Sequence, residues 1–225
     1  DGALGLGVIR FRGVAPGEMG DNLPAVDLGT GRKALALVTG HTHNCALLDD
    51  RSIKCWGSNE VGQLGQGDSR NRGANAGEMG DSLPAVSLGT GRVARGLTAG
   101  SGRTCALLDD GFVKCWGGNA FGMLGLGSQW TAGRGASPME MGDNLPPVAL
   151  GTGRTTLTVE AGYWHTCAIL DNHTLKCWGA NRDGQLGSGD DEHRGDATGE
   201  MGDALLPVSL GAGRTISTLE PGYPH

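Results

Sequence analysis

The stretch T-H-N-C-A-L-L-D-D-R-S-I-K-C-W-G-S-N-E-V-G-Q-L-G-Q-G, residues 42–67, decides the fold because the chain contains it three times. The second copy, T-C-A-L-L-D-D-G-F-V-K-C-W-G-G-N-A-F-G-M-L-G-L-G, covers 104–127. The third copy, T-C-A-I-L-D-N-H-T-L-K-C-W-G-A-N-R-D-G-Q-L-G-S-G, covers 166–189. Self-similarity on this scale is typical of a solenoid, a propeller or a linear array.

Each copy predicts a β-hairpin. The runs C-A-L-L and I-K-C-W, with close variants in the other copies, are strand-like, and turn-forming residues separate them. In the second copy the three-residue loop that ends at Gly111 fits a type I turn followed by a glycine in the left-handed region. That register places Leu107 opposite Val113 and Cys105 opposite Cys115.

The same register brings the two cysteines of every copy together. Directly opposed residues in a non-hydrogen-bonded antiparallel pair have α-carbons about 4.5 Å apart, near the short end of the range that a disulfide accepts. Six reduced thiols in the core are the alternative. The spacing favours three cross-strand disulfides, Cys45–Cys55, Cys105–Cys115 and Cys167–Cys177.

Six cysteines in three local pairs indicate an oxidising compartment: the extracellular space, the cell surface or an organelle lumen. The sequon Asn172-His173-Thr174 lies on the predicted tip of the third hairpin, so Asn172 is an exposed candidate for N-glycosylation. The chain begins at Asp1 and not at methionine, so we expect processing or truncation.

A second repeated block, G-E-M-G-D-N-L-P-A-V-D-L-G-T-G-R at 17–32, sets the period. Its methionine recurs at 19, 79, 141 and 201, in steps of 60, 62 and 60 residues. We expect one repeat array over 1–225, with a partial repeat at 1–40 and hairpin-centred repeats near 41–100, 101–162 and 163–225. Both ends stop beside a missing hairpin, which predicts a segment of a longer chain or an open arc that needs neighbours.

Each period contains four short strand-like runs, P-A-V-D-L, A-L-A-L-V-T-G, C-A-L-L and I-K-C-W-G. The G-Q-L-G-x-G-D segment and its polar extension are expected to form a long surface loop. No segment shows a capped apolar period of 3.6 residues, so helix content should be low. Four antiparallel strands in a period of this length predict an all-β fold of propeller blades, about 60 residues each, in a partial ring or a segment of a longer propeller.

The string G-x-x-H-T-C-A-L-x-D-D-G-x-V-K-C-W-G-x-N-x-x-G-Q-L-G-x-G-D resembles the repeat of the regulator of chromosome condensation family. The resemblance covers nearly the whole chain, because the glycines, W-G and G-Q-L-G recur in register. It implies a ring of about seven blades in complete members. Two departures matter: the cysteine pairs suggest an extracytoplasmic branch, and the M-G-D-N-L-P insertion lengthens a repeat that is usually about fifty residues long.

Charge and hydropathy exclude two classes of partner. The net charge is −6 and the basic residues are scattered, whereas nucleic-acid binders usually show a basic patch or a pI above roughly 9. No run of about 18 apolar residues is present, so we expect no membrane-spanning segment.

We find no active site and expect no enzyme, no cofactor and no metal. The L-G-T-G-R loops lack the Gly-Lys-Ser/Thr ending and the following helix of a P-loop, so they are interpreted as turns. An acidic pair recurs in each M-G-D block, but calcium takes about six to eight oxygens, so turn capping or pairing with arginine is favoured. No serine or histidine stands apart from the repeat with a catalytic partner.

Five tryptophans fall into two groups. Trp56, Trp116 and Trp178 share one repeat position, which favours filling of the gap between blades over stacking on a sugar or absorbing light. Trp130 and Trp164 break the repeat pattern and are the candidate interaction residues.

These observations predict a non-enzymatic protein-interaction or structural subunit, built of propeller repeats and part of a larger assembly. A propeller's partner is set by its loops and not by its fold. One alternative is a lectin-like carbohydrate-binding module that uses Trp130, Trp164 and the acidic loops. A second, implied by the family resemblance alone, is a guanine-nucleotide exchange factor for a small GTPase.

Overall fold

The computed structural model describes residues 2–127 and 133–220, and these residues form nine strands, five single-turn 3-10 helices and no α-helix. The strands make three antiparallel sheets in sequence order. The first sheet contains β1 (Ala34–Thr39), β2 (His43–Leu48) and β3 (Ile53–Gly57); the second contains β4 (Ala94–Ala99), β5 (Arg103–Leu108) and β6 (Val113–Gly117); the third contains β7 (Thr156–Ala161), β8 (His165–Leu170) and β9 (Leu175–Gly179). The 3-10 turns are η1 (Gly20–Asn22), η2 (Gly80–Ser82), η3 (Ala120–Gly122), η4 (Gly142–Asn144) and η5 (Gly202–Ala204).

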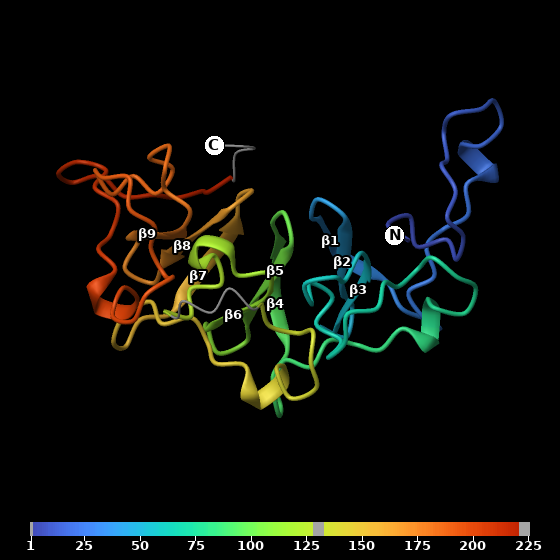
Figure 1. Cartoon of the computed structure of the whole chain (residues 1–225), viewed down its shortest axis with the longest axis horizontal. Coiled ribbons are helices and arrows are strands. Elements are labelled where there is room, and N and C mark those ends of the chain that lie inside the picture. The colour runs from blue at the N-terminus through green and yellow to red at the C-terminus, as the bar shows by residue number, and fades with distance from the viewer. Residues whose placement is uncertain (1, 128–132, 221–225) are drawn as a thin grey trace.

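The three sheets follow one another side by side, from the blue sheet to the orange one in Figure 1. Their first strands are the elements that meet: β4 contacts β1 on one side and β7 on the other. Thr98 of β4 accepts the Ala161 N–H and donates its own proton to Glu160 of β7, at 3.0 Å in each case. The sheets are therefore successive blades of a partial propeller, as the sequence predicts.

The hairpin register is the predicted one in every copy. Cys105 pairs with Cys115 and Leu107 with Val113, and the matching residues pair in the other two hairpins. Gly111 has a φ of 82°, the left-handed conformation that its turn requires. Arg51 and His173 hold the same conformation at the same turn position.

The prediction of a fourth regular strand per blade was wrong. The segment 84–88 lies against the outer edge of the first sheet, where Val86 N–H donates to Ile53 at 2.8 Å, but it forms no ladder. A proline opens the P-A-V-D-L run and supplies no N–H. The remainder of this edge is an isolated bridge between Gly57 and Arg72. Each blade thus has three strands and an irregular outer edge.

Alternate residues of each hairpin face opposite neighbours. Cys45, Leu47 and Ile53 point from the first sheet towards the second and pack against Leu108 and Trp116. The second sheet repeats this arrangement towards the third. The period of two along each strand therefore gives every blade one face for the blade before it and one for the blade after it.

All six cysteines are paired in these inter-blade layers. Each pair has α-carbons 4.1 Å apart and closes a loop with a sequence separation of 10. Trp116 and Trp178 are fully buried and Trp56 is nearly so, which confirms that the repeat tryptophans fill the gaps between blades. Within the described residues, no helix is long and apolar enough to cross a membrane.

Replacing Cys105 and Cys115 together by alanine should lower the free energy of unfolding by about 2–3 kcal/mol, because the closed loop no longer limits the unfolded chain. Urea unfolding of the double variant and of the wild type measures the change. Wild-type protein unfolded in the presence of a reductant is the control and should lose more, since it loses all three bridges. An unchanged urea midpoint in the double variant would contradict the assignment.

Candidate interaction surface

One main-chain carbonyl joins each pair of neighbouring blades. The carbonyl of Gln63 accepts the indole N–H of Trp116 at 3.1 Å and the hydroxyl of Thr104 at 2.9 Å. Met123 does the same for Trp178 and Thr166, and Ala3 for Trp56 and Asn44. A buried carbonyl needs such donors, so the segment before each hairpin is fixed to the blade that follows.

The G-Q-L-G segment is therefore not the surface loop that the sequence predicts. Leu64 is fully buried and Gln63 nearly so. Gly65 has a φ of 66°, and a Cβ placed on it would lie 2.8 Å from the indole nitrogen of Trp116. The conserved spacing of G-Q-L-G and W-G within the chain reflects this contact between adjacent blades.

The buried side chain of His43 adds a hydrogen bond at the contact between the first and second blades. Thr104 gives its proton to Gln63, so the imidazole of His43 must donate through Nε2 to the Thr104 oxygen, 2.9 Å away. The Nδ1 atom of His43 then carries a lone pair with no partner among the described residues. Burial lowers the pKa of His43 to about 4, so the ring is neutral at physiological pH.

Arg103 occupies the corresponding position in the second blade and is completely buried. Its guanidinium donates to the carbonyls of Gly162, Tyr163 and His165, and its Nε donates to Thr166 at 3.0 Å. These hydrogen-bond acceptors are all neutral groups, and burial lowers the pKa of Arg103 to about 9. Arg103 thus holds the loop between β7 and β8 from beneath.

That loop carries the candidate residue Trp164, which is 44% exposed. Tyr163 lies edge-on to it with ring centroids 4.7 Å apart, and Phe121 of η3 approaches it at 6.0 Å. Phe121 also contacts His193 at 4.8 Å, and Tyr163 contacts His41 at 6.0 Å. We call these five residues the aromatic surface. It combines loops of all three blades at the end of the strands opposite the hairpin tips.

Sequence reasoning identified Trp164 but missed its four neighbours. The signal was present in a comparison of the copies: Phe121 stands where the other copies have Val61 and Asp183. Trp164 likewise stands where they have Thr42 and Gly102. The other candidate, Trp130, lies outside the described residues.

The recurring acidic residues act within the fold. Asp143 accepts the N–H and the hydroxyl of Thr90 from the preceding L-G-T-G-R turn, at 2.8 and 2.6 Å, and these bonds lower its pKa. Glu140 accepts three consecutive main-chain N–H groups, the first from Gly135. The arginine of the same turn, Arg92, pairs with the two aspartates of the hairpin tip. The same arrangement, with small changes, recurs in other copies.

Among the described residues no group of three His, Cys, Asp or Glu side chains is placed to hold a metal.

Asn172 lies on the exposed tip of the third hairpin. Its Oδ1 accepts the hydroxyl of Thr174 at 2.7 Å and the Thr174 N–H at 3.2 Å. The sequon is therefore folded into a local turn whose asparagine side chain faces solvent.

Each blade matches a known repeat. The regulator of chromosome condensation (RCC1) repeat matches residues 36–63, 95–122 and 158–185. Each match begins in the first strand of a blade. The first match ends at Gln63, whose carbonyl binds Trp116, and the second ends one residue before Met123, whose carbonyl binds Trp178. This chain is an RCC1-repeat protein.

Related RCC1-repeat proteins are considerably longer. The chain is 30% identical over 197 residues to the ultraviolet-B receptor UVR8 of Arabidopsis thaliana, covering 86% of this chain and 38% of the receptor. It is 27% identical over 189 residues to the human E3 ubiquitin-protein ligase HERC2, covering 83% of this chain and 4% of the ligase. The structure of Prp20p from Saccharomyces cerevisiae superimposes with a TM-score of 0.60 at 20% identity, covering 80% of this chain and 39% of Prp20p. The last comparison supports the fold alone.

The stability of this RCC1-repeat protein should fall in acid partly through His43. Its pKa of about 4 in the folded protein lies below the ordinary histidine pKa of 6.5, so the unfolded chain binds the proton more tightly. The contribution, about 3 kcal/mol, is complete above pH 6.5 and is lost as the pH falls towards 4. Urea midpoints measured across this range should change less steeply in His43→Gln. The control is the exposed His41→Gln, which should follow the wild type; a wild-type slope in His43→Gln would contradict the prediction.

Proposed function

We propose that this RCC1-repeat protein is a non-enzymatic interaction subunit that binds a protein partner through its aromatic surface and works in an oxidising compartment. The observation that carries the proposal is the exposed Trp164, held above the buried Arg103 and flanked by Tyr163 and Phe121. Aromatic side chains are enriched at the centres of protein interfaces, because they bury a large apolar area and lose few rotamers.

Known partners of related propellers support a role in protein binding. Prp20p is described together with its binding to Gsp1p and histones, and its structure bound to Kap60 superimposes on this chain with a TM-score of 0.56. The polar groups that recur in this chain are already engaged in the fold. The cysteines are bridged and the acidic side chains accept main-chain N–H groups, which favours binding over catalysis.

The three disulfides and the exposed sequon at Asn172 support the extracellular space, the cell surface or an organelle lumen. Alkylation of the protein from its native source, before and after reduction, should label no cysteine in the first case and all six in the second. Mass spectrometry of the same sample reads the occupancy of Asn172. Six thiols that are labelled without reduction would contradict the oxidising compartment.

Trp164→Thr, which introduces the residue found at Thr42, should lower partner recovery several-fold while leaving the urea midpoint unchanged. Affinity purification from the native source with quantitative mass spectrometry measures the recovery. Leu206→Thr is the matched control, because Leu206 is a 76% exposed apolar residue that is not one of the five residues of the aromatic surface. Equal recovery with both variants, or a wild-type chain that elutes alone, would rule out the proposed surface.

A carbohydrate-binding module is the second candidate, because an exposed indole such as Trp164 can stack on a sugar ring. A glycan array decides between the two. Sugar binding that disappears in Trp164→Thr, without loss of protein partners, would favour the lectin-like function.

A further inference from the structure

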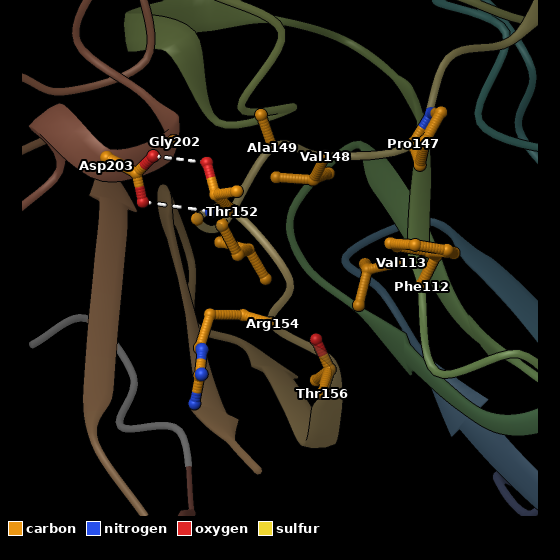
Figure 2. A pocket seen from close by; sticks show the side chains of 12 residues that line it. Phe112, Val113, Pro147, Val148, Ala149, Thr152, Arg154, Thr156, Gly202 and Asp203 are labelled. Carbon is orange, nitrogen blue, oxygen red and sulfur yellow. Dashed lines mark hydrogen bonds between the residues drawn. The ribbon is translucent and has the colours of Figure 1, made fainter. Parts of the chain in front are cut away.

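A hollow lies at the end of the strands opposite the aromatic surface, beside the tip of the β5–β6 hairpin. Its volume is about 290 Å³, and Figure 2 shows the side chains that surround it. Phe112 and Val113 come from the hairpin, Pro147 and Val148 from the outer-edge segment, and Thr156 from the start of β7. Thr152 and Asp203, which bind one another, stand at one side of it.

The corresponding junction one repeat earlier has a different lining. Where the pocket has Phe112, Pro147, Ala149 and Thr156, the earlier copy has Ser52, Ala85, Ser87 and Ala94. The main-chain contact that supports both junctions is the same: Val148 N–H donates to Val113, as Val86 N–H donates to Ile53. The contact between neighbouring blades forms with either set of residues. Folding therefore does not require the larger apolar side chains Phe112 and Pro147, nor the hydroxyl of Thr156.

The hydroxyl of Thr156 is a polar group that lines this pocket. The residue is only 4% exposed, and its hydroxyl makes no hydrogen bond to another described residue. Figure 2 shows its oxygen directed into the space between Val113 and Arg154. Its oxygen is not among the fully buried unpaired atoms of the described residues, so solvent reaches it through the hollow, and a ligand hydroxyl placed there would take the place of that solvent.

We propose that this pocket binds a single uncharged phenol-type ring, with the ring between Phe112, Pro147 and Val148 and its hydroxyl on Thr156. Small-molecule sites range from about 300 to 1,000 Å³, so a hollow of this size suits one ring and not a larger ligand. The apolar side chains cover the faces of the ring, and Phe112, at 44% exposure, is positioned to stack against it. The site is separate from the aromatic surface and does not depend on it.

Titration of the full chain with p-cresol, followed by the methyl resonances of Val113 and Val148, tests the site. Toluene, which has the same ring and no hydroxyl, is the matched probe. We expect p-cresol to bind saturably and about two- to twelvefold more tightly than toluene, the range that corresponds to one hydrogen bond.

Two variants borrow residues from the preceding repeat, where the junction already folds with them. Thr156→Ala should reduce p-cresol binding to the level of toluene and leave toluene binding unchanged. Phe112→Ser should weaken both probes. Trp164→Thr, which lies at the aromatic surface, should bind both probes as the wild type does, so the outcome is independent of the proposed interaction function.

Equal wild-type affinities for the two probes, unchanged p-cresol binding in Thr156→Ala, or no saturation up to the solubility limit would each overturn the proposal.

The tripeptides Gly-Tyr-Gly and Gly-Phe-Gly then identify the source of the ring. Tight binding of the tyrosine peptide alone assigns the pocket to a tyrosine side chain of a partner. Binding of p-cresol without the tyrosine peptide assigns it to a free phenol.

Discussion

The indole N–H of each repeat tryptophan donates to a main-chain carbonyl of the preceding segment, and the rest of the molecule is arranged around that bond. Ala3, Gln63 and Met123 supply the carbonyls, about 60 residues apart in the chain. Because each bond joins two neighbouring blades, stability is built from nearest-neighbour contacts, as in other repeat proteins. The disulfide of one blade and the tryptophan of the next share the same apolar layer, so the covalent link and the hydrogen bond support one interface.

The contact between blades accommodates either a histidine or an arginine at one repeat position, and the two residues bind different groups of the following blade. His43 adds a neutral ring that donates one hydrogen bond to the next blade. Arg103, at the same position, brings a buried guanidinium that takes three carbonyls of the next loop. Main-chain carbonyls and no carboxylate face its charge, and burial lowers its pKa to about 9. A change inside one junction thereby determines how a surface loop is held.

Variation between copies is concentrated where the junctions do not need a fixed residue. Trp164 replaces Thr42 and Gly102 at one end of the strands, and Phe112 replaces Ser52 at the other. The first change contributes to the aromatic surface and the second to the pocket beside the hairpin tip. A propeller of this kind can therefore specialise individual blades while the shared framework is retained.

The sequence by itself determined the repeat, the hairpin register and the pairing of Cys105 with Cys115, because these depend on residues about ten positions apart and on a turn that Gly111 permits. The tertiary structure decided what depends on the neighbouring blade. It buried Leu64, left the P-A-V-D-L run as an irregular edge, and brought Phe121 onto Trp164. Those contacts join residues tens of positions apart in the chain. Their partners are set by how one sheet packs on the next, which local periodicity does not encode.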